Sequence, residues 1–289
     1  ADLAGGYVRL RRRRLPWVIS MHNIYGPHSW SGAALLPVLS RVWRSADTII
    51  AISGAVKDWL VHQRGVPSER VQVIHYGIDA APWLVPHPDA KGRWGLAGRP
   101  VVGAIGRLTP HKGFATLVSA WPAVRSQIPD AVLAIAGWDV KGHRQELQAL
   151  IDGLGLQDAV RLVGFVDAVP AFLAACDVFV HPSTSEGFGQ VVIEAMAAAR
   201  PVVALRIPPL TEIVVDGETG FLVPPGDADA MGAALRRVLS DPRSGALGLR
   251  GRARVLEDFS AGCMAERTRQ VYCDLLHDRL TDPVRAAGY

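Results

Sequence analysis

Two glutamates, Glu186 and Glu194, stand eight residues apart in the segment EGFGQVVIE. A glycine-containing turn follows the first, and a helical pattern beginning near Gly189 carries the second about one and a half turns into the helix. Glu186 therefore precedes a helix amino terminus, where free backbone N–H groups and a partial positive charge suit an anion such as phosphate. The segment indicates a site for a sugar attached to a phosphate.

A second group of charged residues lies in the sequence GRLTPHKG, directly after the apolar run 101–105. A glycine lets the backbone turn at the carboxyl end of a strand, the edge at which open α/β sheets bind ligands. From this turn, Arg107 and Lys112 can direct a guanidinium and an ammonium into one crevice. Two such cations suit a diphosphate leaving group, which gains negative charge as its bond breaks.

The composition restricts the class of protein. A chain of 289 residues with 49% hydrophobic content can bury one large core or two medium ones. The three cysteines, Cys176, Cys263 and Cys273, are too few and too scattered for a disulfide framework or a zinc cluster, and they favour a reducing compartment. No run of about 20 apolar residues exists, so the sequence predicts no membrane-spanning helix.

The net charge is only +4, and the one dense basic cluster is Arg11–Arg14. Three interpretations stay open: a solvated helix face before a strand at Trp17, attraction to anionic lipid headgroups, or nucleic-acid binding. The last is disfavoured because no aromatic residues of the kind that stack on bases accompany the cluster. The first residues also lack an initiator methionine, so we expect a fragment or a processed product.

Short apolar runs alternate with helical patterns along the chain, which predicts an α/β protein whose parallel sheets are covered by helices on both faces. The expected strands span residues 17–20, 48–52, 71–74, 101–105, 132–136, 160–163, 178–180, 202–205 and 220–223. The expected helices span residues 33–44, 55–64, 114–127, 144–154, 169–175, 189–199, 228–239 and 266–280.

The segment 80–99 is rich in Pro and Gly and lacks a clean period, so it predicts a break between two domains. We expect residues 1–85 to form a first Rossmann-like domain and residues 86–265 to form a second one, with a closing helix and tail over 266–289. Six predicted strands suffice for a complete doubly wound domain, whereas three are half of one. The first domain is therefore expected to be incomplete.

These patterns together resemble the retaining glycosyltransferases of family 4, the glycosyl transferases group 1, which have the GT-B architecture of two Rossmann-like domains. The resemblance covers nearly all of the chain from about Trp17 onward and is densest over residues 99–239. It implies an acceptor-side first domain and a second domain that binds the nucleotide sugar. The matching strings are VIHYGID, AISGAVK, GRLTPHKG, LVGFV, ACDVFVHPSTSEGFGQVVIEAMA, RPVVAL and EIVVDGETGFLVPPGD.

The resemblance assigns roles to single residues. Arg107 and Lys112 match the pair that holds the donor diphosphate, and Glu194 matches the glutamate that hydrogen-bonds the ribose hydroxyls. Glu186 and His22 match catalytic residues at the donor sugar. The remaining matches are Gly187, Phe188 and Gly189 for the sugar hydroxyls, and Gly164, Phe165 and Val166 for the wall against the nucleobase.

No metal site and no cofactor are expected, because the resemblance implies only a nucleotide sugar as substrate. The triplet Asp227-Ala228-Asp229 opens a predicted helix, so we interpret Asp227 as its N-cap. Asp79 is expected to cap the connection between the domains. The side chains of three further histidines are expected to be structural; they are His75, His111 and His181.

The implied reaction is transfer of a hexose from a nucleotide-diphosphate sugar to an acceptor hydroxyl with the anomeric configuration retained. The donor stays open among GDP-mannose, UDP-glucose and UDP-N-acetylglucosamine. The expected acceptor is a glycan or a lipid-linked sugar in lipopolysaccharide or other cell-surface glycan synthesis. This predicts a cytoplasmic protein, with contact at the inner face of the plasma membrane through Arg11–Arg14 and no nucleic-acid partner.

Other functional classes remain as alternatives. One is a catalytically silent protein or fragment that binds a nucleotide sugar without turnover. Another is a sugar-nucleotide epimerase or a phosphorylase of the same architecture. A dinucleotide oxidoreductase is disfavoured because no G-x-G-x-x-G lies between a strand and a helix. The sequence departs from the family pattern at 137–139, at Ala199-Arg200 and at 207–210, and the first and last of these leave donor and acceptor identity open.

Overall fold

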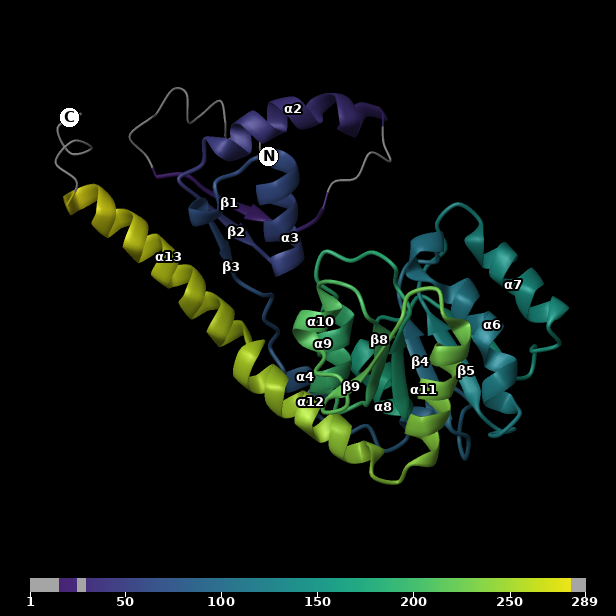
Figure 1. Cartoon of the computed structure of the whole chain (residues 1–289). Helices are drawn as coiled ribbons and strands as arrows, with labels where there is room; N and C mark the ends of the chain where they lie inside the picture. The colour runs from purple at the N-terminus through teal and green to yellow at the C-terminus, as the bar shows by residue number, and fades with distance from the viewer. Residues whose placement is uncertain (1–15, 25–29, 282–289) are drawn as a thin grey trace. The chain divides into compact units, whose positions relative to one another are not determined.

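The computed structural model describes residues 16–24 and 30–281 (Figure 1). Arg11–Arg14, the predicted membrane contact, lie outside the described residues. None of the helices described has both the length and the apolar character that a bilayer crossing requires.

The chain divides into two compact units. One contains the described residues up to Gly77 together with those from Ala261 onward, and the other is Ile78–Ser260. The domain limits predicted from the sequence, at 85/86 and 265/266, lie a few residues further along the chain. The closing helix starts earlier than the predicted 266 and groups with the first unit.

The first unit contains a three-stranded parallel sheet in the order β1-β2-β3. The long helix α13 packs against this sheet, because Val271 forms a buried cluster with Ile50 and Ile74. The strands are β1 (Val18–Met21), β2 (Thr48–Ala51) and β3 (Val71–Val73), and the helices are α2 (Trp30–Arg44), α3 (Gly54–Asp58), the π-helical continuation η1 (Trp59–Gln63), the short 3-10 helix η2 (Ser68–Arg70) and α13 (Ala261–Thr281).

The second unit contains a six-stranded sheet in the order β6-β5-β4-β7-β8-β9, with every adjacent pair parallel. All nine strands predicted from the sequence are present, four of them with the predicted bounds. The six strands of this unit are β4 (Val101–Ile105), β5 (Val132–Ala136), β6 (Val160–Gly164), β7 (Val178–His181), β8 (Val202–Leu205) and β9 (Gly220–Val223).

Helices cover both faces of this sheet, as Figure 1 shows. Because successive strand side chains point to opposite faces, Leu133 and Ile135 enter the core with α6, α7 and α11, whereas Val132 and Ala134 pack on the side of α8. The helical elements of the unit are α4 (Ala81–Leu84), α5 (Ala90–Arg93), η3 (Pro110–Lys112), α6 (Phe114–Arg125), α7 (His143–Gly153), α8 (Val169–Ala175), α9 (Gln190–Ala197), α10 (Leu210–Ile213), α11 (Ala228–Ser240) and α12 (Ser244–Asp258).

Helix α12 was not predicted from the sequence. Three glycines and three arginines interrupt the apolar residues of its segment, which therefore lacks a clear apolar period. The glycines are needed for packing: a Cβ atom at Gly248 would lie 2.1 Å from the carbonyl oxygen of Ala199. The helix therefore reaches its neighbour by close backbone approach, which a search for apolar periodicity does not detect.

The strand order creates one topological switch point. From β4 the chain adds β5 and β6 on one side of the sheet, and it then returns to add β7, β8 and β9 on the other side. The connections that leave β4 and β7 therefore diverge, and a crevice opens between them at their carboxyl ends. The two charged sequence segments, GRLTPHKG and EGFGQVVIE, follow β4 and β7 and meet at this edge.

Helix α9 ends in a hydrogen-bonded turn that places Ala199 in a left-handed conformation with a φ of 53°. The amide of Ala199 donates to the Met196 carbonyl and the amide of Arg200 donates to the Ala195 carbonyl, the two bonds of a Schellman motif. Glycine is favoured at this position because a Cβ atom is strained there.

We expect Ala199→Gly to raise the free energy of unfolding of the second unit by about 1 kcal/mol, because it relieves this strain. Urea denaturation monitored by circular dichroism would measure the change. Ala198→Gly is the matched control, since Ala198 has a φ of −72° and gains nothing from glycine. Equal effects of the two substitutions would contradict the assignment of strain to Ala199.

Candidate functional site

A cleft of about 560 Å³ lies at the carboxyl edge of the second sheet; we call it the carboxyl-edge cleft. Its walls come from the segments that follow β4, β5, β6 and β7 and from the amino-terminal end of α9. The lining residues include Ile105, Gly106, Arg107, Lys112, Ala136, Gly137, Trp138, Phe165, Val166, Val169, His181, Glu186, Gly189, Gln190, Val191 and Glu194.

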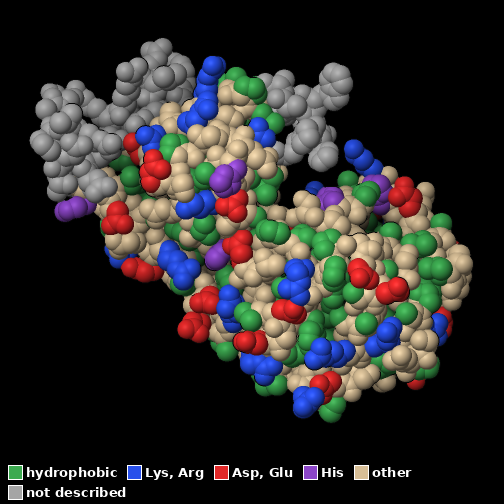
Figure 2. Space-filling model, in the orientation of Figure 1, with side chains coloured by type: hydrophobic (Ala, Val, Ile, Leu, Met, Phe, Trp, Pro, Cys, Tyr) green, Lys and Arg blue, Asp and Glu red, His purple; other side chains and the backbone are tan. Residues whose placement is uncertain are grey.

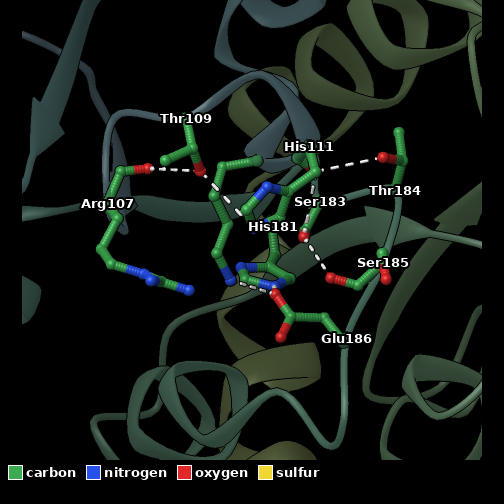
Figure 3. A network of polar contacts seen from close by, with 9 residues as sticks. Arg107, Thr109, His111, His181, Ser183, Thr184, Ser185 and Glu186 are labelled. Carbon is green, nitrogen blue, oxygen red and sulfur yellow. Dashed lines mark hydrogen bonds and ion pairs between the residues drawn. The ribbon is translucent and has the colours of Figure 1, made fainter. Parts of the chain in front are cut away.

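Glu186 is the centre of a polar cluster in this cleft (Figure 3). Its Oε1 accepts hydrogen bonds from Lys112 Nζ at 2.5 Å and from His181 Nε2 at 2.8 Å. All three side chains are largely withdrawn from solvent, with exposed fractions of 12%, 15% and 3% for Glu186, Lys112 and His181. The cluster therefore joins the turn after β4 to the last residue of β7 and the loop that follows it.

Opposing effects act on the ionisation of Glu186. Burial alone would raise its pKa, but the hydrogen bond and charge of His181, followed by the ammonium of Lys112, outweigh burial and hold the pKa at about 2. Glu186 is consequently a carboxylate at every physiological pH. A fixed negative charge beside a cleft can stabilise positive charge that develops on a bound group, or it can act as a nucleophile.

Backbone contacts hold the two loops of the cluster together. The carbonyl oxygen of His111 accepts hydrogen bonds from the Thr184 amide at 2.8 Å, from Thr184 Oγ1 at 3.1 Å and from Ser183 Oγ at 3.3 Å. Gly113 has a φ of 71°, and a Cβ atom there would lie 1.9 Å from the Pro182 carbonyl oxygen. Only glycine allows this approach, so Gly113 is a structural requirement for the position of Lys112.

Arg107 is exposed and extends towards the region of the Glu186 carboxylate (Figure 3). Among the described residues, no carboxylate forms an ion pair with its guanidinium. Burial lowers the pKa of the adjacent His111, and the positive charges of Lys112 and Arg107 lower it further. This part of the cleft therefore presents a positive charge that can bind an anion.

Glu194 lies on α9, and its partner is Gln190, whose Nε2 donates to Oε1 at 3.3 Å. Burial raises the pKa of Glu194 to about 7, and the hydrogen bond from Gln190 offsets only part of that effect. Glu186 and Glu194 thus lie in opposite environments. The surroundings of Glu186 stabilise its ionised form, whereas burial destabilises the ionised form of Glu194. The two glutamates have separate partners and do not form an acid–base pair.

Two aromatic side chains stand at the wall of the cleft formed after β5 and β6. Trp138 and Phe165 are 52% and 61% exposed, and their ring centroids are 5.6 Å apart. Large exposed rings of this kind provide flat surfaces for a planar ligand group. Gly164, predicted to belong to this wall, is not a lining residue; its carbonyl oxygen accepts a hydrogen bond of 2.7 Å from the Gly137 amide and so supports the loop that carries Trp138.

Seven of the residues predicted for the site lie together in the structure. Arg107, Lys112, Phe165, Val166, Glu186, Gly189 and Glu194 meet in the carboxyl-edge cleft. Phe188 is buried against Phe259, and Gly187 is not a lining residue, so the predicted role of their backbone amides remains a prediction. His22 follows β1 in the first unit, where its Nδ1 lies 2.5 Å from the Tyr76 hydroxyl, and its catalytic role also remains a prediction.

Two residues of the site were missed. His181 was expected to be only structural, yet it hydrogen-bonds the central carboxylate. Its position as the last residue of a buried strand, at the edge where α/β sheets bind ligands, could have identified it. Trp138 was considered only as part of the segment 137–139, which departs from the family pattern. Asp227 does cap α11, as predicted, since its Oδ1 accepts from the Ala230 amide at 2.8 Å.

Comparison with known proteins identifies the family. The family model of glycosyl transferases group 1 matches residues 89–254, and the model of glycosyltransferase family 4 matches residues 1–81. The chain belongs to the glycosyl transferases group 1. Its fold is the GT-B type, with a smaller first sheet.

Relatives of this glycosyltransferase family differ in what their names say they act on. The GDP-mannose-dependent alpha-(1-6)-phosphatidylinositol monomannoside mannosyltransferase of Mycolicibacterium smegmatis is 35% identical over 79% of this chain and 63% of its own length. The lipopolysaccharide core biosynthesis mannosyltransferase LpsB of Rhizobium meliloti is 32% identical over 81% of this chain and 67% of its own length. The chain therefore spans less than two thirds of the length of the first of these relatives.

Among solved structures, HepE of Anabaena in complex with UDP and glucose is similar to this chain. The TM-score is 0.86 at 28% sequence identity, over 94% of this chain and 75% of that one. The similarity extends to both units. Within the described residues of this family member, no group of three or more His, Cys, Asp and Glu side chains is arranged to hold a metal ion.

The raised pKa of Glu194 predicts a pH-dependent cost to stability. Because its folded pKa is about 7 and its ordinary value is 4.5, the folded state loses stability as pH rises from about 4.5 through 7. We expect Glu194→Gln to remove this loss and to raise the free energy of unfolding above pH 7, by on the order of 3 kcal/mol at most. Thermal unfolding from pH 4 to pH 9 would measure it.

Glu257→Gln, which removes the same charge from an exposed position of α12, serves as the control for that experiment. A Glu194→Gln protein that gains no stability between pH 4.5 and pH 8 relative to this control would show that Glu194 ionises freely in the folded chain.

The lowered pKa of Glu186 predicts the opposite pH dependence. Its folded pKa of about 2 lies below the ordinary 4.5, so it contributes stability above pH 4.5 that is lost as pH falls towards 2. His181→Phe should retain packing against Phe179 but remove the hydrogen bond to Glu186. We expect the variant to lose less stability than the wild type over this interval, by on the order of 1 kcal/mol.

Urea denaturation at several pH values between 2 and 6 would measure this difference. His111→Phe is the matched control, because the exposed imidazole of His111 belongs to the same site but contacts Thr109 instead of the Glu186 carboxylate. If His181→Phe and the wild type lose stability in parallel, the hydrogen bond from His181 does not set the ionisation of Glu186.

Proposed function

We propose that this chain carries the donor site of a retaining hexosyltransferase, which moves a hexose from a nucleotide-diphosphate sugar to an acceptor hydroxyl. One observation carries the proposal: Arg107, Lys112, Glu186 and Glu194, separated by up to 87 positions in the sequence, line a single cleft at the switch point of the sheet. Cations, a permanent carboxylate and a helix amino terminus together match the charges of a nucleotide sugar.

Each residue then has a role that follows from its charge. Lys112, Arg107 and the amino-terminal end of α9 stabilise the diphosphate as the bond from the anomeric carbon breaks and its electron pair passes to a diphosphate oxygen. The acceptor hydroxyl oxygen forms the new bond to the anomeric carbon, and its proton passes to the departing diphosphate. Glu186 faces this step as a carboxylate, either as a nucleophile or as a stabiliser of positive charge on the sugar.

In this proposal, Glu194 binds the ribose of the nucleotide. A carboxylate can accept hydrogen bonds from both ribose hydroxyls, and these bonds compensate for the burial that raises its pKa in the free protein. Phe165 and Val166, together with Trp138, offer the base an apolar wall. The names of the relatives and of the similar structure support GDP-mannose and UDP-glucose as the first donors to test.

For the acceptor, we propose a glycan or a lipid-linked sugar of the cell surface. The support is the names of two relatives, which specify phosphatidylinositol monomannoside and lipopolysaccharide core synthesis. The proposal that the protein acts at the inner face of the plasma membrane rests on the names of the same two relatives.

A donor screen tests the proposed reaction. The chain would be incubated with GDP-mannose, UDP-glucose or UDP-N-acetylglucosamine, with and without an extract of cell-surface glycans and glycolipids, and free nucleotide and glycosylated product would both be followed. Nucleotide release that requires the acceptor supports transfer. Binding without turnover supports the silent binding protein, and conversion without an acceptor supports an epimerase.

The two glutamates should be separable in this assay. We expect Glu186→Gln to lower kcat at least about 1,000-fold, because a fixed charge at the reacting carbon is lost, while the Kd for the nucleoside diphosphate changes less than threefold. Glu194→Gln should instead weaken nucleoside diphosphate binding about tenfold or more. Calorimetry and initial rates would measure the two effects, with the exposed Glu146→Gln as a control. Equal effects on binding and turnover would contradict the assigned roles.

A further inference from the structure

A second cleft, of about 870 Å³, lies at the opposite edge of the same sheet; we call it the amino-edge cleft. Pro100, Val178 and Pro201, which line it, stand at or next to the first residues of β4, β7 and β8. Because the strands are parallel, their amino ends form the edge opposite to the one that holds Glu186. The two clefts share no lining residue.

The lining of the amino-edge cleft is strongly basic. It contains the cationic side chains of Lys91, Arg99, Arg200 and Arg252 and one carboxylate, that of Asp177. Lys91 neutralises Asp177 through a contact of 2.7 Å between Nζ and Oδ2. The charges of three guanidinium groups therefore remain around the cleft.

Figure 2 shows Lys, Arg, Asp and Glu side chains interspersed over the visible face of the second unit. Mixed signs of this kind are ordinary for a solvated surface. The amino-edge cleft differs from that pattern because none of its three guanidinium groups forms an ion pair with a carboxylate that lines it.

Backbone carbonyls hold all three guanidinium groups in place. Arg99 donates from Nε to the Asp130 carbonyl at 2.9 Å and from NH1 to the Asp158 carbonyl at 3.2 Å. Arg200 donates from Nε to the Ala198 carbonyl and from NH1 to the Cys176 carbonyl, each at 2.9 Å. Arg252 donates from Nε to the Ala197 carbonyl at 2.8 Å. Carbonyl oxygens orient a guanidinium without cancelling its charge, and within the described part of the chain these bonds occupy two of the five N–H groups of Arg200 and one of those of Arg252.

Arg200 and Arg252 are both half-buried, and they repel each other. Burial lowers the pKa of Arg200, Cys176 and Asp177 raise it, and the charge of Arg252 lowers it by a smaller amount. Holding two like charges together away from water costs free energy unless an anion compensates them. The arrangement is therefore that of a site prepared for an anion.

The other walls indicate the rest of the ligand. Ser244 and Gly245 bring the amino-terminal end of the 15-residue helix α12 to the cleft, and its partial positive charge also favours an anion. Beside it, Leu249 is 61% exposed and the half-buried Leu239 adds further apolar surface. A cleft of this size has room for a charged group and an organic body.

We propose that the amino-edge cleft binds a small phosphate monoester, with the phosphate between Arg200 and Arg252 and the organic body against Leu249. Two guanidinium forks and a helix end suit a tetrahedral dianion with three terminal oxygens better than they suit a planar carboxylate. The site is separate from the carboxyl-edge cleft and needs none of its residues.

Binding of phenyl phosphate to the full chain would test this proposal, with calorimetry for affinity and hydrogen exchange for location. We expect saturable binding that persists in Lys112→Gln, whose carboxyl-edge cleft has lost a cation, and that protects amides of residues 197–201 and 244–252. Arg252→Gln and Arg200→Gln should each weaken binding about tenfold or more, since each removes one charge but retains an amide donor. Arg250→Gln, at an exposed position of the same helix outside the lining, should leave it unchanged.

Two results would overturn the proposal: binding abolished by Lys112→Gln but unaffected by Arg252→Gln, or no saturable binding by the wild type. Affinity for UDP should be the same in Arg252→Gln and the wild type, which shows that the fold is retained. If Arg200→Gln does not fold, Arg252→Gln alone decides the outcome. Phenol should not bind, because the phosphate supplies the charge that the cleft recognises.

Discussion

The pairing of β4 with β7 is the constraint on which the site depends. It brings residues from two distant parts of the chain to adjacent strand ends, so that Lys112 and Glu186 can meet at 2.5 Å. The close approach at Gly113 and the bonds to the His111 carbonyl keep the loops in that position. Without the parallel pairing, these charges would be unrelated surface groups, worth little to stability.

The carboxyl-edge cleft combines a stabilised and a destabilised carboxylate. Glu186 gains more from His181 and Lys112 than it loses by burial, whereas Glu194 has only a long hydrogen bond from Gln190 to offset burial. Such a difference favours ligand binding. A ligand that donates hydrogen bonds to the Glu194 carboxylate offsets the desolvation cost that remains uncompensated in the folded protein without ligand. The stability of the empty protein and its affinity for a ligand are therefore coupled at this residue.

The two edges of the second sheet present different chemistry. At the carboxyl edge, cations lie beside two carboxylates and exposed aromatic rings, which suits a ligand with separate phosphate, sugar and base groups. At the amino edge, guanidinium groups held by carbonyls surround one neutralised carboxylate. Helix α12 makes the second arrangement possible, since its glycines allow Arg252 to approach the end of α9.

The sequence alone determined the α/β class and all nine strands, because buried parallel strands are continuous apolar runs. The charged segments that directly follow two of these strands, together with the resemblance to the family, also predicted seven residues that line the carboxyl-edge cleft. The sequence did not reveal helix α12, whose packing depends on close backbone approach. It also could not show that His181 binds Glu186 or that burial raises the pKa of Glu194. Only the tertiary structure decides these, because burial and hydrogen-bond partners arise from segments that are far apart in the chain.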